Sequence, residues 1–154
     1  MRGIYVVNMT AVAVTGAISL IQIKAGANCS IEIIRASVSQ SNLVSSALQR
    51  VQLLRKTATA TVTSFTPLIM ATNDAAAQSA GGTSATGTNA SAEGTDGDIL
   101  VNEMFNVLNG MWLYLPVPEE RPQIIPAGFI ALKLPTAPAS SMTTTAQIVF
   151  REIS

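Results

Sequence analysis

Three neighbouring charged side chains, Glu119, Glu120 and Arg121, are the first place in this sequence to look for catalytic chemistry. They lie in WLYLPVPEERPQIIPAGFIALKLPTAP, residues 112–138, a stretch that holds six of the seven prolines of the chain. Two carboxylates can cleave a glycosidic bond only if they converge on one substrate, whereas adjacent residues of a strand point to opposite faces. Arg121 beside them is more simply an ion-pair partner. The triplet therefore does not predict an active site.

Few other residues could catalyse a reaction or hold a metal. Histidine is absent and Cys29 is the single cysteine, which excludes an internal disulfide and removes the usual general base and the commonest zinc ligand. Cys29 is expected to be a small buried side chain. Asp96, Asp98 and Glu103 offer oxygen ligands for a hard cation, but their spacing does not match an EF-hand. We therefore expect no enzyme, no cofactor and no bound metal.

The elements that would position these residues are short strands. Runs rich in β-branched and apolar residues, separated by turn residues, predict eight or nine strands at the intervals of a β-sandwich or barrel. The predicted strands are residues 4–14, 18–25, 29–40, 47–57, 61–72, 99–108, 111–117, 129–135 and 143–153. A helical turn is allowed near Ser45–Leu48. The chain length fits one domain, residues 1–154, with a sizeable core.

Alternation in residues 29–40 predicts which side chains of that strand share a face. Ile31, Ile33 and Arg35 fall on one face. The other face carries Glu32, Ile34, Ala36 and Val38. This strand is therefore expected to be buried on at least one side.

The run MWLYLPV, residues 111–117, is apolar on both faces. Trp112 and Tyr114 have the same parity and share one face. The other face carries Met111, Leu113 and Leu115. A strand of this kind suits either sheet packing plus a partner chain, or a subunit interface around an aromatic anchor. An ordinary core position for Trp112 is an equal alternative.

Residues 73–96, NDAAAQSAGGTSATGTNASAEGTD, are almost all small or polar and include no large apolar side chain. Such a stretch buries too little to offset the entropy of ordering it, so the sequence predicts a long Ala/Gly/Ser/Thr-rich loop. The loop is either exposed and flexible, or an arm that becomes ordered by lying across a neighbouring subunit.

The composition predicts a surface that associates with other chains. The net charge is zero, 12% of the residues are charged and 48% are hydrophobic, so little charge keeps the chain monomeric. Residues 71–103 hold five acidic residues and no basic one, whereas residues 1–70 hold one acidic residue and six basic ones. The six are Arg2, Lys24, Arg35, Arg50, Arg55 and Lys56. Opposite charges on one chain suit self-association, and the lack of a dense basic cluster argues against nucleic acid.

The N-terminal apolar stretch does not have the pattern of a targeting or membrane segment. Polar residues interrupt it every few positions, at Asn8, Thr10, Thr15, Ser19 and Gln22. Neither a signal peptide nor a membrane span is therefore expected.

Several stretches resemble small jelly-roll proteins that are encoded beside the major capsid gene of tailed bacteriophages and prophages. They are IEIIRASVSQS, LQRVQLLRK, ILVNEMFNVLNGMWLYLPVPEERPQIIPAGFIALKLPTAPAS and TTTAQIVFREI. The resemblance rests on an aromatic-Leu-Pro-x-Pro-Glu-Glu-Arg element, on the strand and turn GFIALKLPTAP, and on a terminal strand that ends in an acidic residue and isoleucine. It leaves out the Ala/Gly/Thr-rich loop.

The resemblance implies a single-domain jelly-roll β-sandwich with antiparallel strands and a structural role in the virion. The implied protein is a head decoration or cement protein, made in the host cytoplasm without a signal peptide. It would assemble as a homotrimer on the outer surface of a phage capsid and clamp neighbouring major capsid subunits. The residues expected at interfaces are the matched motif positions Pro118, Glu119, Glu120 and Arg121 and the aromatic pair Trp112 and Tyr114.

A jelly-roll trimer could instead form the head of a phage fibre or tail tip that binds a host receptor or glycan. Exposed aromatic side chains and polar loops would then form a ligand pocket. A fibre head is expected to follow a repetitive or coiled-coil attachment segment, whereas here a predicted strand begins at once. The decoration protein is therefore our preferred hypothesis, and the fibre head is the alternative.

Overall fold

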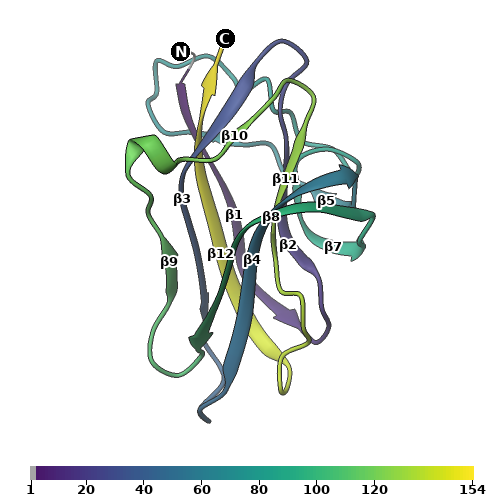
Figure 1. Cartoon of the computed structure of the whole chain (residues 1–154), viewed down its shortest axis with the longest axis vertical. Helices are drawn as coiled ribbons and strands as arrows, with labels where there is room; N and C mark the ends of the chain where they lie inside the picture. The colour runs from purple at the N-terminus through teal and green to yellow at the C-terminus, as the bar shows by residue number, and fades with distance from the viewer. Residues whose placement is uncertain (1–2) are drawn as a thin grey trace.

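The computed structural model describes residues 3–154, so Arg2, one of the basic residues counted above, lies outside the described residues. Two antiparallel sheets pack face to face, and the protein is an all-β sandwich, as the sequence predicts (Figure 1). The single helical element of the described residues is the 3-10 turn η1, Pro118–Glu120. Within residues 3–154, no helix is long and apolar enough to cross a membrane.

We call the two sheets A and B. Sheet A has the strand order β10-β3-β12-β1-β6, and β9 also pairs with β3. Its strands are β1 (Gly3–Val14), β3 (Ser30–Gln40), β6 (Leu68–Ile69), β9 (Trp112–Tyr114), β10 (Gln123–Ile124) and β12 (Met142–Ile153). Sheet B has the order β5-β7-β2-β11-β4-β8. Its strands are β2 (Ser19–Lys24), β4 (Leu48–Ala58), β5 (Thr61–Ser64), β7 (Gly87–Ala92), β8 (Thr95–Asn106) and β11 (Phe129–Lys133).

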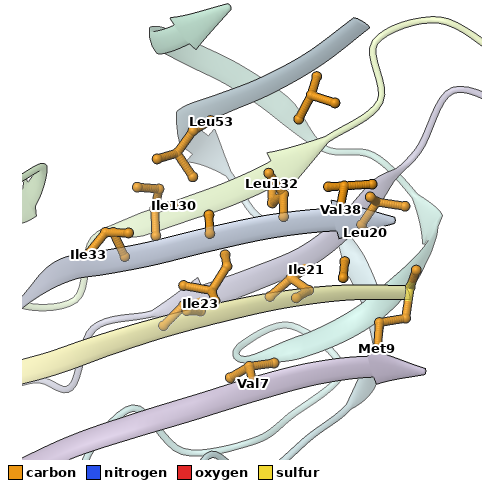
Figure 2. Close-up of a cluster of buried hydrophobic side chains, with 14 of the residues drawn as sticks. Val7, Met9, Leu20, Ile21, Ile23, Ile33, Val38, Leu53, Ile130 and Leu132 are labelled. Atoms are coloured by element: carbon orange, nitrogen blue, oxygen red, sulfur yellow. The ribbon is translucent and has the colours of Figure 1, made fainter. Parts of the chain in front are cut away.

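The main core lies between the sheets and contains side chains from both of them. Val7 and Met9 from β1 and Ile33 from β3 belong to one cluster with Ile130 and Leu132 from β11 (Figure 2). None of these five side chains is more than 2% exposed. Because complete burial of such a side chain contributes about 1.5–3 kcal/mol, this layer is the main source of stability.

A β-bulge in β3 makes one sequence prediction wrong. Strict alternation placed Arg35 on the same face as Ile31 and Ile33, but the pairing with β12 passes from Ile33 directly to Arg35, so Ile34 is an extra residue. The bulge reverses the alternation: Ala36 is fully buried on the core side, and Arg35 faces outward. Bulges depend on the pairing with the neighbouring strand, which the sequence of β3 alone does not contain.

Two predicted local structures also differ from the structure. Residues 45–47 form no helical turn, and β4 begins directly at Leu48. The predicted strand 61–72 is divided into β5 in sheet B and β6 in sheet A, so the chain crosses between the sheets there. Pro67 lies in this crossing, outside the strands, so its missing N–H costs no hydrogen bond between strands.

The prediction of a loop over residues 73–96 is wrong for its second half. Residues 87–92 form β7, which lies between β2 and β5, and β8 begins at Thr95. Small side chains permit this pairing, because a Cβ on Gly87 would lie only 2.3 Å from the carbonyl oxygen of Thr63. The sequence offered no apolar alternation by which to recognise such a strand.

The first half of the segment is held by contacts within its own chain. The Tyr5 hydroxyl donates to the Ala75 carbonyl at 2.9 Å, and the backbone N–H of Ser79 donates to Glu152 Oε1 at 2.8 Å. Both Tyr5 and Glu152 are fully buried. A neighbouring subunit is therefore not required to order residues 73–86.

Strand β8 is a long edge strand of sheet B. It pairs with β4 alone, and its pairing register shifts three times between Leu53 and Ala58 of β4. The remaining section, residues 101–106, pairs regularly with residues 48–53. One side of β8 thus keeps backbone groups without a strand partner.

A truncation in the core tests the packing between the sheets. Leu132→Ala removes a fully buried side chain, so we expect the free energy of unfolding to fall by about 2–5 kcal/mol in urea denaturation. The control is Val44→Ala, because Val44 is 87% exposed and its loss should cost less than about 0.5 kcal/mol. Equal losses for the two variants would contradict this core.

Candidate interaction surface

Strand β9 brings the predicted aromatic pair to the inner side of sheet A. Trp112 pairs with Val38 and Tyr114 with Ala36, and both β3 residues face the core. The two rings stack with centroids 6.2 Å apart and planes inclined by 5°, which confirms that they share a face. Trp112 is only 4% exposed. It therefore occupies a core position, the ordinary alternative considered for it, and it is not an exposed anchor.

A hydrogen bond fixes the outer end of Trp112, and nearby carboxylates act on Tyr114 through their charge. The indole Nε1–H of Trp112 donates to Glu103 Oε2 at 2.7 Å. Burial, and then the negative charges of Glu120 and Glu103, raise the pKa of Tyr114. A tyrosine hydroxyl already keeps its proton at neutral pH, and this shift only favours the protonated, hydrogen-bond-donating form further.

The opposite face of β9 and the residues after it are apolar and exposed. Leu113 is 49% exposed, Leu115 63% and Val117 54%. In Figure 1, β9 lies at the side of the sandwich, and the chain continues from it to η1, which stands out from the body. We call residues 113–121 the corner. Leu113, Leu115 and Val117 are thus available to a partner.

A buried carboxylate anchors the corner. Glu32 on β3 is 2% exposed, and its Oε1 lies 3.3 Å from Nη1 of Arg121. Its Oε2 accepts hydrogen bonds from Nε and Nη2 of Arg151 at 2.9 and 2.7 Å. Arg121 is thus an ion-pair partner as expected, but of a residue far away in the sequence. Because a buried charge is stable only when it is paired, this triad fixes the end of the corner to the sheet.

The predicted acidic pair is exposed and points to no active site. Glu119 and Glu120 lie in η1, neither is buried, and among residues 3–154 no salt bridge includes either of them. Pro118, which begins η1, is exposed as well. Of the six predicted interface residues, the structure thus leaves three fully accessible, buries Trp112, and places Tyr114 and Arg121 at intermediate depth.

Asp96, Asp98 and Glu103, the three candidate calcium ligands, each contact different partners. Asp96 binds two lysines, Glu103 accepts from Trp112, and Asp98 lies 3.9 Å from Arg55. Within the described part of the chain, no group of three or more His, Cys, Asp or Glu side chains could hold a metal ion. Cys29 is buried, as the sequence predicts.

A charged cluster around the buried Lys56 lies on the outer face of sheet B, and sequence reasoning missed it. Nζ of Lys56 lies 2.8 Å from Asp96 Oδ1 and donates to the Glu93 carbonyl at 2.7 Å. Nζ of Lys133 lies 2.6 Å from Asp96 Oδ2. The two Glu93 carboxylate oxygens accept from the N–H and the hydroxyl of Ser19 at 2.6 and 2.8 Å. We call these residues the lysine–carboxylate cluster.

The cluster joins the turn between β7 and β8 to β2, β4 and β11. Nearby, the amide of Gln22 donates to the Ala85 carbonyl at 2.7 Å and accepts from the Ala60 N–H at 2.8 Å. Gln22 and Lys56 are 0% and 5% exposed, although they face away from the main core. The chain therefore covers this part of the outer face of sheet B with its own residues, and the cluster has a structural role.

The cluster predicts the dependence of stability on pH. Burial alone would raise the pKa of Asp96, but hydrogen bonds from Lys133 and Lys56 outweigh it and lower that pKa. The ionised Asp96 thus stabilises the fold at pH values above about 3.9, and this contribution is lost as the pH falls through the lowered pKa. Burial would lower the pKa of Lys133, but Asp96 and Glu93 raise it, so its contribution is complete below about pH 10.4 and is lost at higher pH.

We expect Asp96→Asn to lower the free energy of unfolding at pH 7 and to have much less effect near pH 2. The measurement is urea denaturation across this pH range, with Asp98→Asn, which removes a carboxylate that is 85% exposed, as the matched control. A deficit for Asp96→Asn that is the same at pH 2 and pH 7 would contradict the role of the ionised carboxylate.

A second substitution tests the anchor of the corner. Glu32→Gln keeps the size of the side chain but leaves Arg121 and Arg151 without their carboxylate, so we expect a loss of about 1–3 kcal/mol in the free energy of unfolding. Limited proteolysis should also cut the corner faster. Glu119→Gln removes an exposed carboxylate nearby and should change neither quantity. An unaltered cleavage rate in Glu32→Gln would show that the triad does not hold the corner.

Two of the surface pockets are each lined by an arginine. One of about 350 Å³ is lined by Arg55, Asp98, Gln123 and Phe129 among others, and the Arg55 guanidinium donates there to the Gln123 carbonyl at 3.3 Å. It contains no nucleophile paired with a base. The other, of about 300 Å³, is a groove on the outer face of sheet A. Its lining residues are Ile4, Ile34, Arg35, Met70, Leu115 and Val149.

Comparisons with known proteins add no assignment to this geometry. No protein-family model matches the sequence, and neither the curated proteins nor the solved structures include a significant match to it.

Proposed function

We propose that this chain is a structural protein of a phage virion, a head decoration or cement protein. It would assemble as a homo-oligomer, and by resemblance as a trimer, on the outer surface of the capsid and stabilise contacts between major capsid subunits. The observation that carries the proposal is the anchored corner. Leu113, Leu115 and Val117 are about half exposed on a segment that is tied to sheet A by Arg121. Apolar side chains held in a fixed position at a surface suit a protein interface.

The same corner contains YLPVPEER, the element on which the resemblance to phage decoration proteins mainly rests. Its two glutamates are exposed, and within residues 3–154 neither forms a salt bridge. Contacts with a protein partner explain this combination better than substrate binding does. This supports a role in binding and not in catalysis.

The proposed mechanism is stabilisation by mass action. A protein that binds only the assembled lattice adds its binding free energy to the cost of opening the shell. Symmetry repeats each contact many times over the capsid, and linked subunits bind with avidity, so modest individual contacts suffice. The chain needs no cofactor for this role.

The test mixes the purified chain with phage heads that lack it and with heads that already carry it. We expect the chain to co-sediment with the first kind only and to raise the melting temperature of those particles by a few degrees. Failure to bind the bare heads would refute the proposal. Binding to host cells or to surface glycans in place of the heads would favour the fibre head.

A further inference from the structure

An apolar strip crosses the outer face of sheet A. The pairing register joins Leu68 on β6 to Val6 on β1, Val6 to Val149 on β12, and Val149 to Arg35 on β3. Paired residues of antiparallel strands project from the same face, so these four side chains form one row. The groove described above lies on this face. We define the apolar strip by its uncharged members, which are Ile4, Val6, Ile34, Leu68, Met70, Leu115 and Val149. Val6 and Val149 are buried, at 8% and 7% exposed, so the other members present its accessible surface.

Arg35 lines the groove of this strip, whereas Arg151, which pairs with Ile4 on the same face, is bound to Glu32. The bulge at Ile34 turns Arg35 outward into the groove, where its guanidinium hydrogen-bonds the side-chain oxygen of Gln147. Among the residues of the described chain, no carboxylate forms a salt bridge with Arg35. An arginine in apolar surroundings gains most from a carboxylate that it can bind with two parallel hydrogen bonds.

The corner supplies the complementary charge. Glu119 and Glu120 follow Leu115 closely in the sequence, and Leu115 itself lines the groove. Both carboxylates lack a salt bridge within residues 3–154. Within the described residues, neither glutamate forms an ion pair with Arg35 of its own chain. The chain thus presents a cation without a salt bridge, an acidic pair without one, and exposed apolar side chains.

We propose that copies of this chain associate through the apolar strip, with Arg35 of one copy bound to Glu119 or Glu120 of another. A second copy is favoured over other occupants because both complementary charges belong to the same chain, and because Leu115, from the same corner as the glutamates, lines the groove together with Arg35. Each contact would cover exposed parts of Leu115, Leu68 and Met70, which are 63%, 51% and 57% exposed. This inference deepens the proposed function by naming the contact between subunits, and its biological role rests on that function.

The experiment measures the mass of the full chain in solution by light scattering over a range of concentrations, without any capsid. We expect the wild type to be an oligomer and Arg35→Glu to raise its dissociation constant at least tenfold. The double variant Glu119→Arg/Glu120→Arg should do the same. The combined variant R35E/E119R/E120R exchanges the charges across the contact and should restore association.

Matched controls separate this surface from others. Arg50→Glu reverses another cation, which hydrogen-bonds Asn102 on the outer side of β4, and should leave the mass unchanged. Leu115→Ser should dissociate the oligomer, whereas Leu48→Ser, at a position that is 69% exposed, should not. Circular dichroism confirms that each variant is folded before its mass is compared.

Each outcome either supports or overturns the proposed contact between copies. A monomeric wild type, or an oligomer insensitive to R35E and Leu115→Ser, overturns the inference, as does a charge exchange that fails to restore association. An oligomer that follows the expected pattern but ignores phage heads supports the inference while the proposed function fails. A chain that binds heads as a monomer gives the reverse result.

Discussion

A sandwich of two sheets buries one face of each sheet, and the two remaining faces must be covered or left to solvent. This chain covers parts of both faces with its own residues. Over sheet B, residues between β4 and β8 lie on part of the outer face, where Gln22 and Lys56 are buried with their polar groups satisfied, whereas Leu48 and Met104 remain 69% and 48% exposed. Over sheet A, Ile4, Leu68 and Leu115 remain 37–63% exposed. The buried charges and the exposed apolar side chains are thus two results of one constraint.

This arrangement also explains why so weakly charged a chain has an even less charged surface. Lys56, Lys133, Arg121 and Arg151 all bind carboxylates of their own chain, and the partners Glu32 and Glu93 are withdrawn from the surface wholly or in part. These groups specify the positions of turns and of the corner, because a buried charge tolerates few alternative partners. Few charges therefore remain at the surface. The charged side chains on sheet A that form no salt bridge would then contribute more to the choice of a binding partner.

The sequence predicted those parts of the structure that depend on neighbouring residues. Apolar alternation identified most of the long strands, and the parity of Trp112 and Tyr114 placed them on one face. Prediction from the sequence failed where contacts with distant segments determine the local structure. The bulge at Ile34 follows from pairing with β12, and β7 is a strand only because β2 and β5 flank it. The partners Arg121 and Glu32 are 89 residues apart, so the motif that contains Arg121 could not reveal what anchors it.

The shifts in register along β8 have a consequence for the kind of assembly that this fold permits. A long, flat edge strand invites another sheet to continue it, and identical chains would then grow into fibrils without a natural end. The bulges opposite Leu53 to Ala58 bend and twist the first half of β8, and they leave only its second half regular. With open-ended growth along this edge restrained, the chain can expose apolar side chains on a sheet face and still form particles of finite size.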